Sequence, residues 1–490
     1  MKELGIEFIT ELNKLSIEER DEVTCDVHGI NAVSEDPELF LISKCVESFE
    51  SEITLIPTSE KEAYSIALEQ NPKYVMDKNF LLMFLRADQF DTKAAAARFV
   101  AFFQVKLELF GRDKLGRDIR VDDLDEDDIA CLESGYAQVL NARDRADRAI
   151  FMLMPMIKKF KTMENRVRAS DFTTDEEQNS SLIVHCLFFL FHTKQRRAIY
   201  MALMFALKDV DTQKHGIVGI AYNVGGGKSR NRQAIMRNAQ LVSALPLKFS
   251  AVHYCFDEEN VRGIFYLAMY VFQKAARIRC RFHLGTDMEI IYTLMTFGIP
   301  NEALPVAFNG SFRLGAHRDY IRRMRKADEI DDDVDRIIVP GKYDVLLGRG
   351  KPLQKYSGNL NYHYIIEGYH DRYEQAAKGV KAELAKEIVT KIKNQGGRFL
   401  KQDEAGWAAI SDETARSKVS HTFRNHRIAA RTALKKALAK AQEISKQNDT
   451  AMPVPCRSNG SILSVRNNLN LRDSKKRKLA HQFDGCLKVL

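Results

Sequence analysis

The stretch Ile217-Val-Gly-Ile-Ala-Tyr-Asn-Val224 decides the class of fold. It is a short, nearly continuous apolar run, and comparable runs occur at Ile150–Met154 and Ala251–Cys255. A fourth segment, Arg277–Leu284, alternates charged and apolar residues. Short apolar runs of this kind are typical of strands that are buried in a sheet. Helical patterns accompany them at Ser181–Leu207, Arg232–Leu245, Glu258–Ala276 and Asp287–Phe297. Strands separated by helices of this length predict an α/β domain with a largely parallel sheet.

Helical patterns dominate the chain before this region. Residues 1–72 are charged and helix-prone, with a surface helix expected to start at Ile17, and they predict a helical N-terminal extension. Between Asp77 and Phe110 the apolar residues have helical spacing, with a break at Asp88-Gln-Phe-Asp91. We therefore expect two short helices packed together before the sheet.

Three segments carry a resemblance to a known family. The first is Phe80-Leu-Leu-Met-Phe-Leu-Arg-Ala-Asp-Gln-Phe-Asp91, followed by four alanines. The second is Lys214-His-Gly-Ile-Val-Gly-Ile220, and the third comprises Phe297-Gly-Ile-Pro300 and Ala303–Gly310. Over about residues 73–320 the chain resembles CRAL-TRIO lipid-binding domains, and we place this domain at residues 73–326. The resemblance implies an apolar cavity over the sheet, covered by a movable gate helix, that holds a lipid or another hydrophobic small molecule.

The sequence gives its own reason to consider a gate helix. The segment from Asn260 to Lys274 is apolar on nearly all sides of a helix, so it must be covered on two faces. The gate interpretation makes ligand-binding candidates of Phe265, Tyr266, Met269, Tyr270 and Phe272. The alternative is a helix held between two layers of its own domain. A carrier of this kind needs no catalytic group and no cofactor, because burial of apolar surface supplies the binding energy.

Two further segments offer cations for an anionic headgroup. Arg322 and Arg323 belong to a basic helix at 317–326 that could meet an anionic membrane surface, or could pair with the acidic run that follows. Lys228 and Ser229 end the run Val224-Gly-Gly-Gly-Lys-Ser229, which is either an anion-binding helix start or a flexible turn. It is not a phosphate-binding loop, because Tyr222 stands where that motif requires its first glycine.

The chain has no recognisable catalytic or metal-binding motif. There is no His-Glu-x-x-His, no Gly-x-Ser-x-Gly, and no further ligand near His253-Tyr-Cys255. Asp122 and Asp123 lie in a highly charged segment, which is more typical of a solvated loop than of a catalytic pair. We expect a protein that is not an enzyme and that needs neither a cofactor nor a metal.

The net charge of +8 on 490 residues hides two unlike parts. From Gly341 onward there are 29 basic and 14 acidic residues, against 45 and 52 before it. An acidic linker at 327–340 separates these parts. After it we expect a basic, mainly helical domain at 341–446, with helices Asn359–Lys378, Val380–Lys393 and Asp412–Lys446, and a disordered basic tail at 447–490.

The basic domain has a signature of its own. Tyr343-Asp-Val-Leu-Leu-Gly-Arg-Gly350, Gly397-Arg-Phe-Leu400 and Ala415–Arg424 resemble a domain of unknown function that is common in diatom proteins, over about residues 341–430. The signature residues are Asp344, Gly348, Arg349, Gly350, Arg398, Lys418 and Arg424. The excess of cations favours a polyanion, either nucleic acid or an anionic membrane surface, or else a protein partner. The alternative is a cationic surface that only keeps the domain soluble.

Targeting signals bear on where the chain works. No secretory signal and no apolar stretch long enough to span a bilayer is evident, and the eight cysteines show no paired spacing. Lys475, Lys476, Arg477 and Lys478 form a cluster that fits nuclear import. We expect an intracellular protein, cytoplasmic or nuclear, and carry two hypotheses: a carrier of a hydrophobic ligand with a C-terminal targeting module, or a nucleic-acid-associated nuclear protein.

Overall fold

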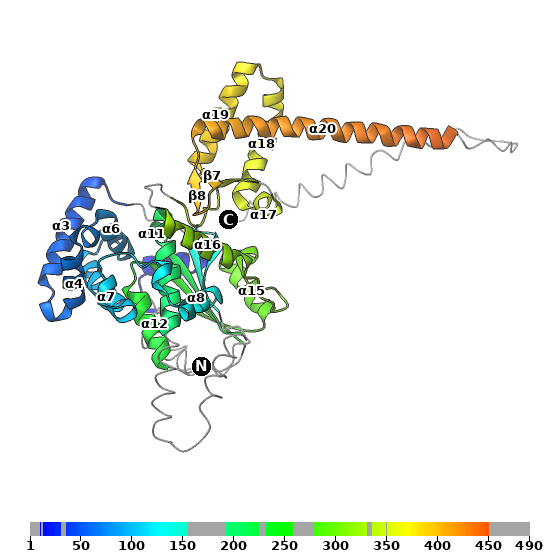
Figure 1. Cartoon of the computed structure of the whole chain (residues 1–490). Helices are drawn as coiled ribbons and strands as arrows, with labels where there is room; N and C mark the ends of the chain where they lie inside the picture. Colours follow the sequence, from blue (N-terminus) through cyan, green and yellow to red (C-terminus); the bar gives the residue numbers. More distant parts are fainter. Residues whose placement is uncertain are drawn as a thin grey trace. The chain divides into compact units, whose positions relative to one another are not determined.

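The computed structural model describes residues 10, 13–30, 36–154, 193–224, 232–257, 278–330, 336–348 and 350–449 (Figure 1). The chain divides into two units, Met1–Phe423 and Arg424–Leu490. The larger unit is mixed α/β, with a helical N-terminus and two sheets that are rich in parallel pairs. The fold class predicted from the strand and helix pattern is therefore confirmed at this level.

The N-terminal region is helical, as expected. Its helices are α2 (Ile17–His28), α3 (Leu39–Leu55), α4 (Glu62–Gln70), α5 (Pro72–Val75), α6 (Lys78–Ala87) and α7 (Thr92–Phe110). The predicted break between α6 and α7 is confirmed, and Gln89 and Phe90 make it with left-handed backbone angles (φ 54° and 65°). Asp91 then caps α7 by accepting hydrogen bonds from the backbone of Lys93 and Ala94.

Aromatic rings hold these helices together. Phe80 and Phe84 on α6 meet Phe99, Phe102 and Phe103 on α7, mostly edge to face, and the Phe84 and Phe99 ring centres are 4.8 Å apart. Edge-to-face packing of this kind adds about 0.5–1.5 kcal/mol per pair beyond the burial of area. The helical spacing of the phenylalanines in the sequence thus corresponds to one shared core.

The main sheet has five strands in sequential order. They are β1 (Ala137–Arg143), β2 (Ala149–Leu153), β3 (Ile217–Tyr222), β4 (Phe249–Phe256) and β5 (Cys280–Leu284). The β1–β2 pair is antiparallel, and β2 to β5 run parallel. All four predicted strands are present. β1 was not predicted, because its sequence Ala-Gln-Val-Leu-Asn-Ala-Arg mixes polar and apolar residues without a clear period.

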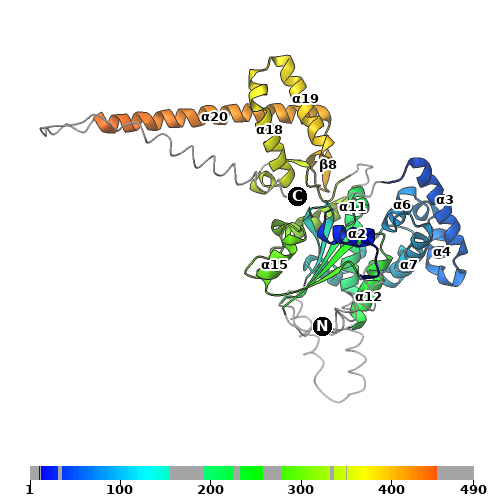
Figure 2. The same ribbon diagram turned by 180° about the vertical axis from the view of Figure 1, so that it is seen from behind.

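Helices cover both faces of this sheet. On one face, Phe151 and Ile217 lie in a core that is shared with several helices. These are α8 (Glu126–Glu133), α12 (Arg232–Ala244), α16 (Gly315–Glu329) and a helix that includes residues 193–206. The short helix α11 (Val210–His215) lies beside these helices (Figure 1). The opposite face carries α2 and α15 (Asp287–Thr296), with α2 lying across the strands (Figure 2). Val23 and Val27 of α2 are buried there. The N-terminal extension therefore contributes α2 to the layer that covers one face of the main sheet. The part of the chain that contains this sheet, residues 73–326, is called the sheet domain below.

Short 3₁₀ turns complete the larger unit. They are η1 (Thr58–Glu60), η2 (Arg112–Lys114), η3 (Val121–Asp123) and η5 (Asn301–Ala303). Of the predicted linker at 327–340, residues 331–335 lie outside the described chain. Ile337, Ile338 and Val339 are buried, and Ile337 pairs with Trp407 through a β-bridge. This stretch packs as part of the fold.

The C-terminal module (residues 341–446) combines helices with a small sheet. The helices are α17 (Lys351–Gln354), α18 (Ser357–Gln375), α19 (Lys378–Asn394) and α20 (Asp412–Asp449). The strands β6 (Val345–Leu347), β7 (Phe399–Gln402) and β8 (Trp407–Ala409) form a sheet in the order β6-β7-β8. The three long helices confirm the prediction. The strands were not predicted, because runs of three or four residues are too short to show a period of two.

Candidate functional site

Several predicted site residues lie outside the described chain. These are the gate-helix candidates Phe265, Tyr266, Met269, Tyr270 and Phe272, the anion candidates Lys228 and Ser229, the signature residue Arg349, and the import candidates Lys475, Lys476, Arg477 and Lys478. Their roles stay predictions. The other candidates can be placed.

The carboxyl edge of the main sheet is the usual ligand-binding edge of an open α/β fold. Here it carries apolar side chains: Met154 follows β2, Val224 follows β3, and Phe256 ends β4, and all three are buried. The adjoining face of the sheet is also apolar and includes Ile150 and Ile220. Among the described residues of this edge, these apolar side chains suit a hydrophobic ligand better than a polar one.

Three histidines surround Phe297 on the α2 side of the sheet. His253 Nδ1 is 3.0 Å from His283 Nε2, and the rings of His28 and His253 lie within 4.8 Å of the Phe297 ring. Burial lowers the pKa of His253 well below 6.5, and burial with the nearby Arg281 charge lowers the pKa of His283 to about 4. Both rings are therefore neutral near pH 7. The described residues contain no group of three or more side chains arranged to hold a metal ion.

The two arginines predicted to meet an anionic headgroup are already occupied. Arg322 forms an exposed ion pair with Asp319 at 2.8 Å. Arg323 is buried and donates to the carbonyl of Ile338 at 2.7 Å. Farther along α16, Arg325 pairs with Glu133. Pairing with the acidic run, the alternative interpretation, is seen only for Lys326, which pairs with Glu329 at 2.8 Å. Arg322 and Arg325 pair with carboxylates outside that run.

Asp344 and Arg398, two residues of the C-terminal signature, form an ion pair in which Asp344 is buried and Arg398 is half-buried. The Asp344 carboxylate accepts from the Arg398 backbone at 2.8 Å and from its guanidinium at 2.9 Å, and also from the backbone of Gly341 at 2.7 Å. Arg398 reaches Asp211 of the sheet domain at 2.6 Å as well. Burial alone would lower the pKa of Arg398, but the bonds and charges of Asp344 and Asp211 outweigh it and raise that pKa.

Other residues near the signature shape the same junction. Asn359 accepts from the backbone N–H of Leu346 at 2.8 Å and donates to its carbonyl at 3.0 Å, which ties α18 to β6. A side chain at Gly358 would collide with the Asp344 carbonyl, and one at Gly397 would collide with the Tyr343 carbonyl. Gly350 has a φ of 128°, which side chains rarely adopt, whereas Gly348 faces only Leu353. These positions therefore hold β6, α18 and the start of β7 together.

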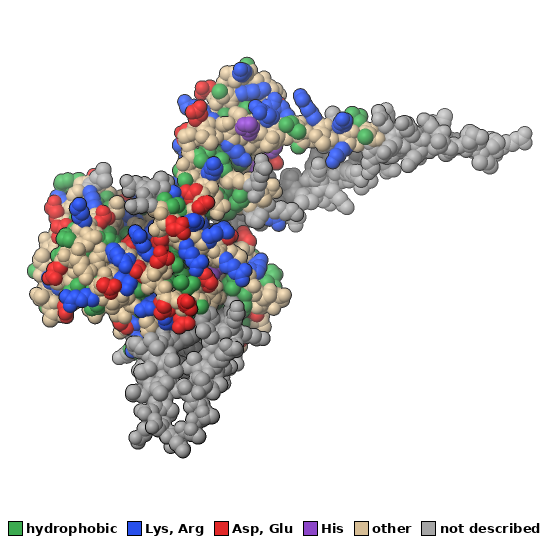
Figure 3. Space-filling view, viewed as in Figure 1, with side chains coloured by type: hydrophobic (Ala, Val, Ile, Leu, Met, Phe, Trp, Pro, Cys, Tyr) green, Lys and Arg blue, Asp and Glu red, His purple; other side chains and the backbone are tan. Residues whose placement is uncertain are grey.

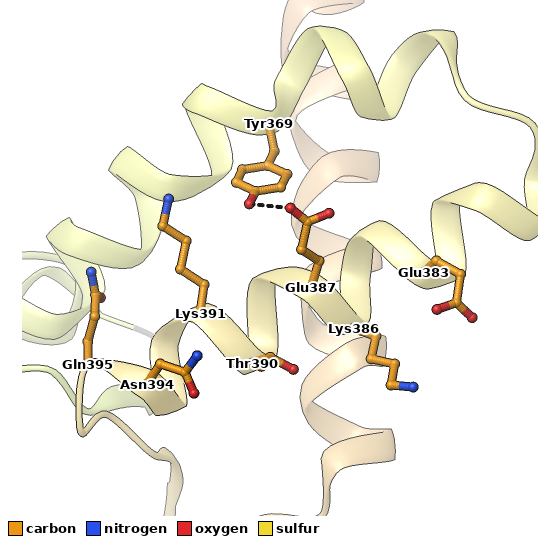
Figure 4. A pocket seen from close by; sticks show the side chains of 8 residues that line it. All are labelled: Tyr369, Glu383, Lys386, Glu387, Thr390, Lys391, Asn394 and Gln395. Atoms are coloured by element: carbon orange, nitrogen blue, oxygen red, sulfur yellow. Dashed lines mark hydrogen bonds between the residues drawn. The ribbon is translucent and has the colours of Figure 1, made fainter.

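An open groove of about 670 Å³ lies along α19 on the surface of the module (Figure 4). Tyr369 of α18 stands over it and donates its hydroxyl hydrogen bond to Glu387 at 2.7 Å. That bond raises the pKa of Tyr369 and lowers that of Glu387. The rest of the lining is polar: Glu383, Lys386, Thr390, Lys391, Asn394 and Gln395. The inner face of α19 is buried in the core, so these side chains form its free face.

The signature residues Lys418 and Arg424 belong to α20. Between Glu413 and Glu443 this helix contains eight Lys or Arg residues and no acidic residue. Arg424, Arg431 and Lys435 are exposed and form no ion pair with the described part of the chain. Lys and Arg side chains are also numerous on the surface over α18 and α19 (Figure 3).

The comparisons with known proteins bear on the C-terminal module. Residues 344–425 match the family model of a domain of unknown function, DUF6824. The match spans the Asp344–Arg398 ion pair, the α18–α19 groove and the start of α20. No curated protein matches the chain. Among the described residues, no helix is both long and apolar enough to cross a membrane.

Proposed function

We propose that the sheet domain binds a lipid or another hydrophobic small molecule and that it does so without catalysis. The observation that carries this proposal is the apolar carboxyl edge formed by Met154, Val224 and Phe256. The resemblance of residues 73–320 to CRAL-TRIO domains supports the same function, as does the doubly apolar segment 260–274 of the sequence. An acyl chain that buries about 400 Å² of apolar surface gains about 10 kcal/mol of binding free energy, at ~25 cal/mol per Å². This gain is large enough for a lipid carrier.

Native mass spectrometry of the full-length protein tests this directly. We expect a bound species that is released on denaturation and that lipid extraction identifies. Replacement of Val224 by Thr keeps the volume but places a hydroxyl at the ligand edge, so it should reduce the loaded fraction. The same change at Val75, which is buried in the N-terminal helices, is the matched control. A protein that stays empty after incubation with mixed-lipid vesicles would contradict the proposal.

The C-terminal module supports a second candidate function, which is the binding of nucleic acid. The observation here is the sequence of α20, which has eight Lys or Arg residues and no acidic residue between Glu413 and Glu443. A polyanion releases counterions when such cations neutralise its phosphates, and this favours association. Under this candidate the Lys475–Lys478 cluster serves nuclear import.

Fluorescence anisotropy of the full chain with labelled DNA and RNA tests the second function. The affinity should fall steeply with salt, and replacing Arg424, Arg431 and Lys435 by Gln should weaken it and reduce the salt dependence. Replacing Lys73, Lys78 and Lys93, which are exposed on the N-terminal helices, by Gln should leave the affinity nearly unchanged. If no binding occurs even at low salt, the candidate is wrong.

A further inference from the structure

A surface of exposed apolar side chains lies at one end of the sheet domain. Of the nineteen large apolar residues that are exposed in the described chain, six belong to one stretch of 29 residues. They form what we call the α15 patch: Leu284, Met288, Tyr292, Met295, Phe308 and Phe312. Exposed apolar residues that occur singly need no explanation, but a group of this size marks an interaction site.

The patch is built from a helix face and a hairpin. Met288, Tyr292 and Met295 follow one another at helical spacing on the outer face of α15, with Tyr292 56% exposed. The inner face of the same helix is buried through Ile290, Ile291 and Leu294, so α15 is apolar on both sides. One apolar face is enough to fix a helix on a sheet, so the second face has another purpose.

A hairpin continues this outer face. Val306 and Phe312 form an isolated β-bridge, and Gly310 makes the turn between them with a φ of 72°. The rings of Tyr292 and Phe308 stack with centres 5.3 Å apart, so helix and hairpin form one surface. Because the patch consists of an outer helix face and a hairpin turn, it projects from the domain.

The position of the patch connects it with the proposed ligand edge. Leu284 is the last residue of β5, so the patch begins at the carboxyl end of a parallel strand. Asp287, at the start of α15, accepts a hydrogen bond from the hydroxyl of Tyr222, the last residue of β3. A hydrophobic ligand that entered or left at this edge would pass beside the patch.

The charges next to the patch favour an anionic partner. Arg313 follows Phe312 directly and Arg318 lies in the first turn of α16; both are exposed, and neither forms an ion pair with the described residues. The neighbouring carboxylate of Glu289 is engaged by the backbone and hydroxyl of Thr286, at 2.8 and 2.9 Å. Arg313 donates a hydrogen bond to the carbonyl of Leu304 at 3.1 Å, which leaves its charge without a carboxylate partner among the described residues. Projecting Met, Tyr and Phe side chains beside arginines whose charge is not neutralised match the boundary between acyl chains and headgroups.

We propose that the α15 patch docks the sheet domain on an anionic lipid bilayer. This inference rests on the proposed binding of a hydrophobic ligand and names the surface from which that ligand is taken or to which it is delivered. The proposed membrane contact thus lies on α15 and the hairpin and not on α16, where Arg322 pairs with Asp319 and Arg323 donates to the carbonyl of Ile338. A fluid bilayer needs no shape complementarity, which suits a surface of flexible methionines and a hairpin turn.

Co-sedimentation of the full-length protein with vesicles tests the proposal. The vesicles are made of phosphatidylcholine alone or with 30% phosphatidylserine, a composition chosen as roughly that of an anionic membrane leaflet. We expect binding that is stronger with phosphatidylserine. A Tyr292→Ser, Phe308→Ser, Phe312→Ser variant should bind the vesicles about tenfold or more weakly, because each ring contributes buried apolar area. The control is Leu360→Ser with Tyr364→Ser, since these residues are exposed on α18.

The possible outcomes separate this proposal from the one on which it rests. The exposed patch residues can be replaced without unfolding the domain, and thermal melting checks this. Vesicle binding that the patch variant retains, or that the control variant loses equally, overturns the docking surface while leaving ligand binding intact. Patch-dependent dimers in sedimentation velocity, without vesicle binding, also overturn it. A protein that binds vesicles through the patch but still holds no lipid after incubation with them overturns the carrier function instead.

Discussion

Charge is used differently in the sheet domain and in the C-terminal module. In the sheet domain Arg143 pairs with Asp209 at 2.9 Å and Arg148 with Asp144 at 2.6 Å, and all four side chains are buried. On α20 the exposed cations Arg424, Arg431 and Lys435 have no carboxylate partner in the described chain. Compensated, buried charge holds a fold in place, whereas uncompensated, exposed charge remains available to a partner. Burial and pairing thus distinguish the charged residues that stabilise the fold from those that are available to bind a partner.

The largest effect is expected where a buried pair is broken. In an Asp144→Ala variant, the Arg148 guanidinium loses two hydrogen bonds, at 2.8 and 2.6 Å, and stays buried. Removing one partner of such a pair costs about 3–5 kcal/mol of unfolding free energy. Asp319→Ala, which breaks the exposed pair with Arg322, should cost less than about 1 kcal/mol. Urea unfolding of both variants measures the contrast, and equal losses would refute it.

A smaller effect is expected from two glycines of the same helix in the module. Gly358→Ala places a methyl group against the Asp344 carbonyl and should destabilise the module by about 1–3 kcal/mol. Gly368, farther along α18, has no atom within 4 Å of the position of a Cβ. Gly368→Ala should therefore stabilise by about 0.5–1 kcal/mol, because alanine loses less backbone freedom. Thermal melts that shift in the same direction for both variants would show that the close approach at Gly358 does not matter.

The sequence predicts the parts of this structure that depend on spacing. The strand runs at Ile150 and Ile217, the break at Asp88-Gln-Phe-Asp91 and the three long helices of the module follow from local patterns that need no knowledge of the fold. It did not predict that Arg323 would be buried, because a cation on a basic helix looks solvated until its neighbour Ile338 is known. The roles of Asp344 and Arg398, 54 residues apart, likewise depend on pairing across β6 and β7.

Exposure was the other property that could not be predicted. The sequence of α15 is apolar on two faces, and only the fold shows that Ile291 faces inward and Tyr292 outward. The same holds for α2, whose charged sequence predicted a surface helix but whose Val23 and Val27 lie on the sheet. Candidate sites that consist of surfaces therefore need the structure, whereas those that consist of motifs can be recognised earlier.

A pH series probes the two neighbouring histidines, His253 and His283, on the α2 side of the main sheet. His253 and His283 have pKa values below 6.5 in the folded protein, with His283 at about 4, so the unfolded chain binds more protons between pH 4 and 6.5. Stability is thus complete above about pH 6.5 and is lost as the pH falls toward 4. We expect a loss of about 3 kcal/mol from His283 as the pH falls from 6.5 to 4. In His283→Gln the amide can still form a hydrogen bond with His253. The unfolding free energy of this variant should depend less steeply on pH between pH 4 and 6.5. An unchanged pH dependence would mean that other groups cause it.

The smallest effect on stability is expected for Glu387→Gln in the groove along α19. The same change is expected to strengthen the binding of nucleic acid. Glu387 forms an exposed pair with Arg372 at 3.4 Å and accepts from Tyr369, and Lys391 lies 5.5 Å from the centre of the Tyr369 ring. Glu387→Gln keeps a hydrogen-bond acceptor for Tyr369 and removes one negative charge, so the unfolding free energy should change by less than about 0.5 kcal/mol.

If the module binds nucleic acid, the loss of this charge next to Lys386 and Lys391 should raise the affinity about two- to threefold at low salt and leave it unchanged at high salt, because the added attraction is screened. Anisotropy titrations at two salt concentrations measure this. Glu413→Gln, at the exposed start of α20, is the control for a general change in net charge. Equal gains for both variants would mean that the module attracts polyanions through its overall charge, and a gain confined to Glu387→Gln would place the contact on the free face of α19.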